Sequence, residues 1–230
     1  MAATRRLSSR LEEVAKMVPE GAYIADIGSD HAFLPISLIQ RGKISYAQAV
    51  ENKMGPFVRM KGNIEDAGLS SHIQCTLADG LDALSEEANT LTLCGIGGLL
   101  TCQILEKDPS KLIPIKTIIC DPHRDLVAVR KRVTALGYYI ADETIVYENK
   151  IYYSIIRFEK GAPESPYNAR DLYFGPVNRK KKTPLYLEWI AATRKTVSAQ
   201  LNKNLSKEKR DYYLKLYRAL STELKESEGK

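Results

Sequence analysis

The chain has 230 residues, of which 44% are hydrophobic, and its 34 Lys and Arg against 28 Asp and Glu give a formal net charge of +6. That length can bury one substantial core and a small second unit. We expect neither a signal peptide nor a membrane span, because no apolar run is long enough for either. The cysteines Cys75, Cys94, Cys102 and Cys120 lack a paired zinc spacing, so we expect reduced thiols, no metal site and a cytoplasmic protein.

A short amphipathic pattern opens the chain. Leu7, Leu11 and Val14 recur at helical spacing, which predicts a helix with one apolar stripe. Three basic residues cluster at its start, namely Arg5, Arg6 and Arg10. We expect this group to contact RNA, as a smaller partner of a basic segment near the C-terminus.

The most informative stretch is YIADIGSDHAFLP at residues 23–35, with Glu51 following 23 residues after Gly28. Residues 23–27 predict a short buried strand, and the polar and glycine residues after it predict a turn into a helix. A glycine at the end of a parallel strand lets a ligand approach the backbone, and a carboxylate one strand later can accept both ribose hydroxyls of an adenosyl group. The spacing therefore predicts a nucleotide-binding turn.

The polar residues of this turn favour S-adenosylmethionine over a dinucleotide. A pyrophosphate needs a glycine-rich cradle of backbone N–H groups, whereas this turn carries Asp26, Asp30 and one glycine. The two carboxylates would repel a pyrophosphate but favour a sulfonium cation. The alternative is a plain strand-to-helix turn in which Asp30 caps the helix.

Strand and helix patterns then alternate along the chain, as a doubly wound sheet requires. The expected strands are residues 44–50, 72–77, 91–94 and 117–120, with intervening helices that include 53–67 and 99–105. A final hairpin, formed by 140–147 and 151–158, gives the sheet an antiparallel end. Rossmann-like methyltransferases end in this way, whereas dinucleotide-binding folds usually continue in parallel. We therefore predict an α/β fold of the class I Rossmann-like S-adenosylmethionine-dependent methyltransferase type.

Residues suited to ligand binding fall at the ends of the predicted strands, where an open α/β sheet binds its ligands. The second strand ends in Glu51, and the third ends in Asp79, whose carboxylate can accept a hydrogen bond from an adenine amino group. The fourth ends in a glycine loop at 94–98 facing the transferring methyl group, with a tight turn before the next helix as the equal alternative. The candidate cofactor-binding residues are Asp26, Gly28, Ser29, His31, Leu34, Pro35, Glu51, Asn52, Asp79, Gly80 and Gly95.

Residues 163–230 differ in charge from residues 1–162. The later segment holds 15 Lys and Arg against 8 Asp and Glu, and the earlier one 19 against 20. Apolar residues at helical steps in 186–201 and 213–224 predict two antiparallel helices, so we expect a methyltransferase domain at 1–162 and a basic helical coiled-coil domain at 163–230. Lys and Arg can simply solubilise such a hairpin, but their density here is the footprint expected of an RNA-contacting surface. The candidate RNA contacts there are Arg179, Lys180, Lys181, Lys182, Lys207 and Arg210.

The sequence resembles the bacterial tRNA (adenine-22-N1)-methyltransferases of the TrmK type. The resemblance starts with LSSRLEEVAKMVPEGAYIADIGSDHAFLP, continues through VENKMGP, ADGL, CGIGG and KIYYSII to DLYFGP, and covers essentially the whole chain. It implies a class I methyltransferase domain and a C-terminal antiparallel coiled-coil domain. It also implies methyl transfer from S-adenosylmethionine, with S-adenosylhomocysteine as product, to N1 of an adenine in the D-loop region of tRNA.

Two departures from the family pattern lie near the expected methyl acceptor. The glycine loop has Cys94 and Ile96 where the family shows AGMGG, and residues 120–123 read CDPH where the family pattern is close to LQPN. Neutral adenine needs no deprotonation at N1 before it attacks a sulfonium methyl, so positioning should dominate catalysis. The candidate catalytic residues are Asp26, Gly95, Gly97, Gly98, Asp121 and His123, and the candidate stacking partners for an unstacked adenine are Phe33, Tyr152 and Tyr153.

Three other functions fit parts of the pattern. A methyltransferase for another RNA position, for example in ribosomal RNA, is the nearest alternative. A small-molecule methyltransferase would not need the basic segment, and a non-catalytic RNA-binding module would not need Asp26, Gly28, Glu51 and Asp79. The expected partner is tRNA, with no membrane and no metal, and a monomer is favoured.

Overall fold

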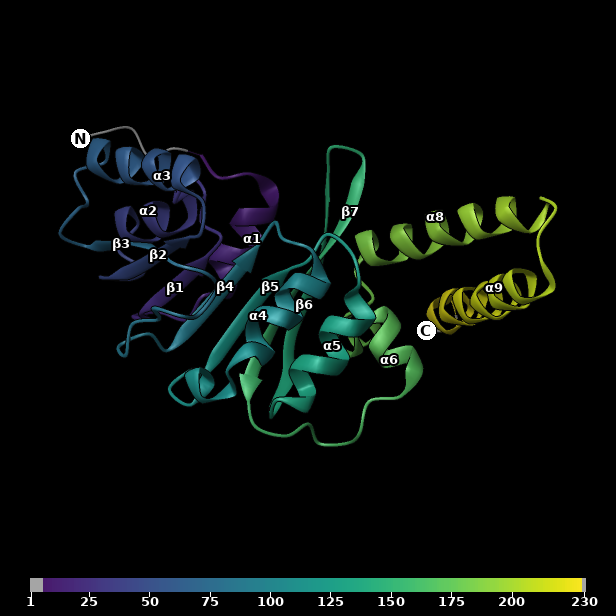
Figure 1. Ribbon diagram of the computed structural model, residues 1–230. Helices are drawn as coiled ribbons and strands as arrows, with labels where there is room; N and C mark the ends of the chain where they lie inside the picture. Colours follow the sequence, from purple (N-terminus) through teal and green to yellow (C-terminus); the bar gives the residue numbers. More distant parts are fainter. Residues whose placement is uncertain (1–5, 229–230) are drawn as a thin grey trace. The chain divides into compact units, whose positions relative to one another are not determined.

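The computed structural model describes residues 6–228 and shows two compact units that divide after Pro166 (Figure 1). Arg5, one of the predicted RNA contacts, lies outside the described residues. No helix among the described residues is both long and apolar enough to cross a membrane. The division falls within the Pro- and Ser-containing segment at 161–166.

Unit 1 is built on one seven-stranded sheet in the order β3-β2-β1-β4-β5-β7-β6. The strands are β1 (Ile24–Ile27), β2 (Ala47–Glu51), β3 (Ile73–Leu77), β4 (Thr90–Cys94), β5 (Thr117–Asp121), β6 (Tyr138–Glu148) and β7 (Ile151–Lys160). The strands β1 to β5 run parallel, whereas β7 pairs antiparallel with both β5 and β6. The predicted parallel sheet with an antiparallel hairpin at one end is therefore confirmed.

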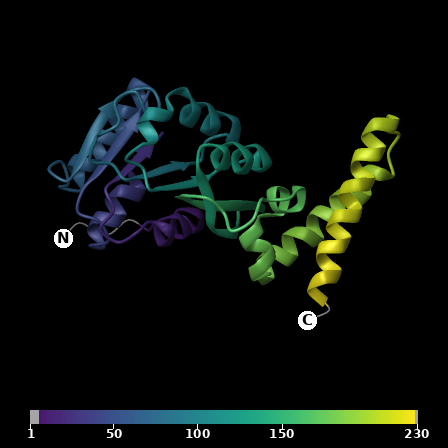
Figure 2. The ribbon, with the colours of Figure 1, turned by 90° about the horizontal axis from the view of Figure 1, so that it is seen from below.

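Helices cover both faces of this sheet. They are α1 (Ser9–Met17), α2 (Phe33–Gln40), α3 (Met54–Asp66), α4 (Gly98–Lys107), the 3-10 helix η1 (Pro109–Leu112) and α5 (Leu126–Ala135). Figure 2 shows α1 on the opposite side of the sheet from α4 and α5. Apolar residues of α1, α2 and α3 join the sheet in one core that includes Val14, Leu38 and Met60. All residues of β1 are buried, as a central strand covered on both faces requires.

The strand order reverses between β1 and β4. From β1 the chain moves outward through β2 to β3, and it then returns to build β4 and β5 on the other side of β1. A crevice opens at such a reversal, at the carboxyl ends of the parallel strands. The turns that follow β1 to β5 all lie at this edge, which is where the sequence places its candidate site residues.

Unit 2 consists of helices. They are α6 (Ala169–Phe174), α7 (Pro176–Lys181), α8 (Pro184–Leu201) and α9 (Lys207–Glu228). Asn168 and Asp171 form a capping box that begins α6, because each side chain accepts a hydrogen bond from the other residue's backbone N–H. The two long helices α8 and α9 pack against each other and are joined by residues 202–206 (Figure 1). The two predicted C-terminal helices are therefore present.

A buried ion pair fastens α5 to the antiparallel hairpin. The Arg130 guanidinium donates to Glu143 Oε1 at 2.8 Å and to Ser154 Oγ at 3.2 Å, which links α5 to both β6 and β7. Both charged side chains are fully buried. A buried charge is costly without its partner, so the pair makes the packing of α5 on the hairpin specific.

We expect Arg130→Ala to destabilise unit 1 by about 3–5 kcal/mol, because it leaves the Glu143 charge buried and uncompensated. Arg132→Ala on the same helix is the matched control, since its ion pair with Glu106 is partly exposed and should contribute far less than the buried pair. Differential scanning calorimetry measures both variants. Fluorescence of Trp189, the single tryptophan, follows unit 2 and should not change. Equal losses in the two variants would contradict a structural role for the buried pair.

Candidate active site

The turn after β1 is held by a buried carboxylate. Asp26 in β1 is 5% exposed, and it accepts hydrogen bonds from Ser29 Oγ at 2.5 Å and from Thr92 Oγ1 in β4 at 2.6 Å, one on each oxygen. Burial raises the pKa of Asp26, and the two hydroxyl donors oppose that rise. Because both oxygens accept hydrogen bonds, Asp26 ties the turn to the neighbouring strand. This geometry favours an orienting role over that of a proton acceptor.

The backbone of the turn is open to a ligand at Gly28. Its φ of +73° lies in the left-handed region, and the N–H groups of Gly28 and Ser29 both donate to the Val50 carbonyl in β2. A Cβ at Gly28 would meet a methyl group of Ile96 at 3.5 Å. The loop after β4 therefore passes next to the first turn at the carboxyl edge of the sheet.

The residues that follow this turn belong to the surface and to the core. The alternative role of Asp30 as a helix cap is wrong, because α2 begins after Ala32 without a side-chain cap. Asp30 instead pairs with Arg59 on α3 at 2.6 Å. Leu34 and Pro35, two of the predicted cofactor contacts, are buried within α2. They support the turn from the core side.

The ends of β2 and β3 carry the predicted ribose and adenine contacts. Glu51 is buried, and its Oε1 accepts the N–H groups of Asn52 and Lys53 at 3.0 and 3.1 Å. Within the described part of the chain its Oε2 accepts no hydrogen bond, so this oxygen is left for a ligand. Asn52 donates to Asp79 Oδ1 at 3.2 Å, which brings candidates from two strands together. Gly80 has a φ of +55°, and a Cβ there would lie 3.1 Å from an isoleucine side chain of α4.

The loops after β4 and β5 are joined by backbone hydrogen bonds. The Gly95 N–H donates to the Asp121 carbonyl at 3.3 Å, and the His123 N–H donates to the Ile96 carbonyl at 3.4 Å. Gly95 has a φ of +73°, and a Cβ there would lie 3.9 Å from His123 Nε2. The glycine loop and the CDPH segment therefore lie side by side at this edge of the sheet.

Arg10 of α1 reaches the end of β5. Its guanidinium forms an ion pair with Asp121, donates to Glu148 at 3.1 Å and lies 3.0 Å from His123 Nε2. It also lies over the Tyr153 ring, 4.6 Å from the ring centroid, as a cation–π contact. The sequence grouped Arg10 with the RNA contacts, but the structure places it in this cluster. We call these five side chains the Arg10 cluster.

The Arg10 cluster contains one buried acceptor without a hydrogen-bond partner among the described residues. Asp121 is fully buried, and burial raises its pKa to about 6 against the opposing effect of Arg10. Asp121 Oδ2 binds Arg10, whereas Oδ1 is buried and has no hydrogen-bond partner among the described residues. Burial and the Arg10 charge lower the pKa of His123. Because a guanidinium can only donate, His123 Nε2 accepts and Nδ1 carries the proton.

The candidate stacking residues are separated by the structure. The Tyr153 ring lies beside His123 in an edge contact, with centroids 5.4 Å apart. Tyr152 packs against a tyrosine of β6 instead, with centroids 4.6 Å apart, because successive strand residues face opposite sides of a sheet. Phe33 stacks on His31 after the first turn, with centroids 4.7 Å apart. Tyr153 is therefore the aromatic residue that belongs to the Arg10 cluster.

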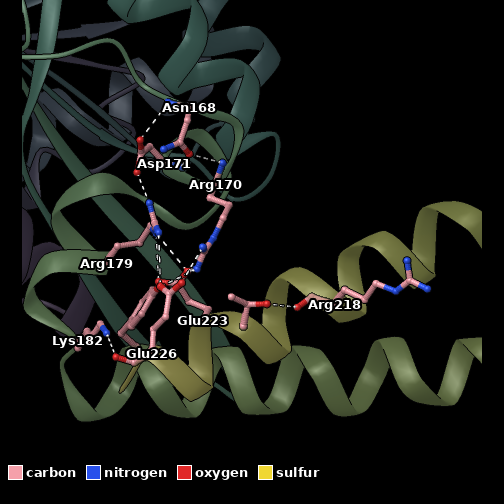
Figure 3. Close-up of polar contacts among 10 residues, drawn as sticks. Asn168, Arg170, Asp171, Arg179, Lys182, Arg218, Glu223 and Glu226 are labelled. Atoms are coloured by element: carbon pink, nitrogen blue, oxygen red, sulfur yellow. Dashed lines mark hydrogen bonds and ion pairs between the residues drawn. The ribbon is translucent and has the colours of Figure 1, made fainter. Parts of the chain in front are cut away.

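The predicted RNA contacts of unit 2 fall into two groups. Arg179 forms ion pairs with Asp171 and Glu223, and Lys182 Nζ donates to the carbonyl oxygen of Glu226 (Figure 3). These two basic side chains are engaged within unit 2. The exposed candidates are Lys180, Lys181, Lys207 and Arg210 in unit 2 and Arg6 in unit 1.

Sequence reasoning missed Thr92, Glu148 and the position of Arg10. Arg10 and Asp121 are 111 residues apart, and no short-range spacing connects them. One signal was available, since a carboxylate at the end of an apolar strand needs a partner when it is buried. No group of three or more His, Cys, Asp or Glu side chains in the described residues could hold a metal ion.

A family model for a methyltransferase domain matches residues 7–156 of the chain. The tRNA (adenine(22)-N(1))-methyltransferase of Bacillus subtilis (strain 168) is 36% identical over 199 residues, which cover 84% of each protein. These similarities extend well beyond the residues of the candidate site.

Solved structures show the same likeness over nearly the full chain. The B. subtilis m1A22 tRNA methyltransferase TrmK matches with a TM-score of 0.86 and 30% identity, over 95% of this chain and 99% of that one. TrmK of M. capricolum, in complex with the cofactor product S-adenosylhomocysteine, matches with a TM-score of 0.85 and 27% identity, over 96% of this chain and 99% of that one. Both matches cover the two units described above.

We expect Gly98→Ala to lower the melting temperature of unit 1. A Cβ at Gly98 would lie 2.3 Å from the Arg124 carbonyl oxygen and 2.9 Å from the Val129 side chain, so α4 or the loop after β5 must shift. Overpacking of this kind costs about 1–3 kcal/mol. Gly97→Ala is the matched control, because a Cβ there meets nothing within 4 Å. Scanning calorimetry of both variants tests this, and equal melting temperatures would count against the close approach of the two loops.

Proposed function

The chain belongs to the tRNA (adenine(22)-N(1))-methyltransferase family, and we propose that it transfers a methyl group from S-adenosylmethionine to N1 of adenine 22 in the D-loop region of bacterial tRNA. The observation that carries this proposal is the convergence of Gly28, Glu51 and Asp79 at the carboxyl edge of the sheet, next to a β5 end where the buried acceptor Asp121 Oδ1 has no hydrogen-bond partner among the described residues. The first three residues suit an adenosyl ligand, and the last suits a base with an exocyclic amino group.

The crevice residues fit S-adenosylmethionine, which when bound supplies a methyl group on a sulfonium cation. Glu51 Oε2 is available to accept hydrogen bonds from ribose hydroxyls, and its partner oxygen is fixed by two backbone N–H groups. Asp79, which accepts from Asn52 on one oxygen and from Lys107 on the other, is proposed to accept the adenine amino group as well. The left-handed backbone at Gly28 permits close approach of the ligand. Buried Asp26 holds this turn in place rather than contacting the reacting atoms.

Asp121 suits the methyl-accepting adenine. The N1 lone pair of adenine is free, so the residues around it need only orient the base and favour the positive charge that it acquires. Asp121 Oδ1 accepts the exocyclic N6–H, which lies next to N1 on the same edge of the base. The ion pair with Arg10 keeps Asp121 ionised at neutral pH despite its burial. His123, held neutral with its proton on Nδ1, lies on the same surface.

The base must leave its stack to present N1, at a cost of a few kcal/mol. Tyr153 is the aromatic residue beside Asp121, and its ring already packs against the planar Arg10 guanidinium. An adenine that stacks there gains a contact that offsets part of the unstacking cost. Tyr153 therefore supports access to the base, while Asp121 sets its orientation.

The tRNA substrate also needs contacts outside the site of methyl transfer. The exposed basic residues Arg6, Lys180, Lys181 and Lys207 are proposed to contact tRNA phosphates, which would contribute affinity with little sequence recognition. No metal is needed to activate a nitrogen that already has a free lone pair. We place the reaction in the cytoplasm, where tRNA is found, and assign it to a monomer.

Methyl transfer to unmodified bacterial tRNA transcripts tests the proposed function directly. With labelled S-adenosylmethionine, we expect incorporation and a reverse-transcription stop at adenine 22, because N1 methylation blocks base pairing. A transcript with guanine at position 22 is the matched control and should lose both signals. A stop at a different adenine, or labelling of ribosomal RNA alone, would replace this target with another RNA position.

We expect the single-turnover rate to fall as pH drops below about 6, because Asp121 is then protonated and loses its charge. Asp121→Asn should remove this acidic limb and lower the rate at pH 8 by about 10–100-fold, the loss expected for a hydrogen bond to a charged group. Replacing adenine 22 by purine, which lacks the amino group, should cause a similar loss that Asp121→Asn does not increase.

Asp66→Asn, an exposed carboxylate at the end of α3, is the control for the pH measurement and should retain the acidic limb. Independent, additive losses from the Asp121 substitution and the purine replacement would show that Asp121 does not contact the amino group. Binding of S-adenosylmethionine should be unchanged throughout.

A further inference from the structure

The basic side chains of unit 2 are not equivalent, and Figure 3 shows one group of them. Glu223 of α9 is 1% exposed, and its carboxylate pairs with Arg170 at 2.5 Å and with Arg179 at 3.2 Å. It also accepts the Tyr186 hydroxyl at 3.0 Å. Glu226 adds a second carboxylate to Arg170 at 2.9 Å. These arginines join α6, α7 and the end of α9, and their charge is compensated within the unit.

A second group of basic side chains lines a groove between α8 and α9. The groove has a volume of about 520 Å³ and is lined by Ala191, Arg194, Lys195, Ser198, Ala199, Asn202 and Tyr217. Five of these residues come from α8, Asn202 follows directly at the C-cap of that helix, and Tyr217 comes from α9. We call this the α8–α9 groove. Its volume lies within the range of roughly 300–1,000 Å³ that is typical of small-ligand sites.

The groove follows from the spacing of residues on α8. Tyr186, Ile190 and Val197 are the buried residues of that helix and form its packing stripe. The groove residues lie on an adjacent stripe at steps of three and four, which places them on one face of the helix. That stripe carries alanine and serine where bulky side chains would fill the space. The small residues therefore leave a hollow beside the helix contact, with cations at its rim.

The charge of the groove is uncompensated. No acidic residue lines it. Among residues 6–228, Arg194 and Lys195 form no ion pair, in contrast to Arg170 and Arg179. The wall opposite these cations carries the half-buried ring of Tyr217. Two unpaired cations beside an aromatic ring are the combination that proteins use to hold a phosphate and an unstacked base.

We propose that the α8–α9 groove binds one nucleotide of the tRNA substrate, with its phosphate on Arg194 and Lys195 and its base against Tyr217. The proposal rests on the proposed function for the identity of the RNA. Asn202, at the end of the groove, offers an amide donor and acceptor to a base edge or a ribose hydroxyl. A nucleotide within a loop fits this site better than a duplex, because its base must be unstacked to reach the ring.

Unit 2 therefore has one group of basic residues that stabilises its fold and a second group that binds RNA. Arg179 lies in the densest cationic run of the sequence, yet its pairing with Asp171 and Glu223 makes it a structural residue. Arg194 and Lys195 lie outside that cationic run, yet they line the groove. The RNA contacts of unit 2 are therefore expected on the face that carries the groove as well as at Lys180, Lys181 and Lys207.

Equilibrium binding of the full chain to tRNA, measured over a range of salt concentrations, tests the groove. Arg194→Ala with Lys195→Ala should weaken binding about 10–100-fold and reduce the slope of log K against log salt by about 1.4–1.8, since each phosphate contact contributes roughly 0.7–0.9. Tyr217→Leu should weaken binding about tenfold with an unchanged slope, because stacking releases no counterions. Tyr217→Phe should bind like the original chain.

The matched control removes the same charge from α9 outside the groove, by Lys209→Ala with Lys215→Ala, and should change affinity less than threefold. Circular dichroism melting of each variant confirms that unit 2 is folded. In steady-state methylation, the groove variants should raise KM for tRNA and leave kcat unchanged.

Equal effects of the groove and control pairs on affinity would overturn the proposal, because they would show only a general electrostatic attraction. A Tyr217→Leu variant that binds normally would also overturn it. Failure of the proposed function is distinguishable: methylation of an RNA position other than adenine 22, with the groove variants still impaired in binding, would change the substrate but keep the groove. Methylation of adenine 22 with an unchanged KM for tRNA in the groove variants would keep the proposed function and overturn the groove proposal.

Discussion

Parallel pairing of β1 to β5 is the constraint on which the rest of unit 1 depends. In the order β3-β2-β1-β4-β5, every carboxyl end lies at one edge of the sheet, and the order reverses at β1 and β4. Backbone hydrogen bonds then join each turn to the end of a neighbouring strand, from Gly28 to Val50 of β2 and from Gly95 to Asp121 of β5. Residues that are far apart in the chain therefore meet at this edge without any covalent or metal link. The antiparallel hairpin of β6 and β7 forms the end of the sheet beyond β5. It brings Tyr153 next to His123, just after the carboxyl end of β5.

The buried carboxylates of unit 1 differ in role, and the role of each depends on its hydrogen-bond and ion-pair partners. Asp26 accepts hydrogen bonds from two hydroxyl groups and so fixes the turn after β1. Glu143 is neutralised by Arg130 and so fixes α5 on the hairpin. Asp121 differs from both, because Arg10 satisfies one oxygen and the other is left open inside the protein. A buried acceptor without a donor costs free energy. The proposed role of this oxygen is to accept a hydrogen bond from the substrate.

The basic residues of unit 2 also differ in role according to their partners. Where carboxylates are buried next to them, as Glu223 is, arginines cross-link short helices that have little apolar surface of their own. Where α8 carries only small and polar residues beside its packing stripe, the cations have no acidic partner and face the groove. Net charge alone does not separate these two uses. The arrangement of acidic residues around each cation does.

The sequence by itself determined the features that depend on local pattern. The alternation of strands and helices, the open turn at Gly28, the carboxylate at Glu51 and the hairpin at the end of the sheet each follow from residues within a few positions of one another. Nearly all of the fold could be predicted for that reason, and the residues proposed to hold the cofactor could be named from the same local patterns.

Only the tertiary structure decided which charged groups meet. It brought Arg10 to Asp121 across 111 residues, paired Asp30 with Arg59 instead of a helix end, and committed Arg179 to Glu223. Ion pairs have no sequence period, because their geometry is set by how whole helices and strands pack. The contacts of Arg10 with Asp121, His123 and Tyr153 and the division of the basic residues could therefore be seen only in the folded chain.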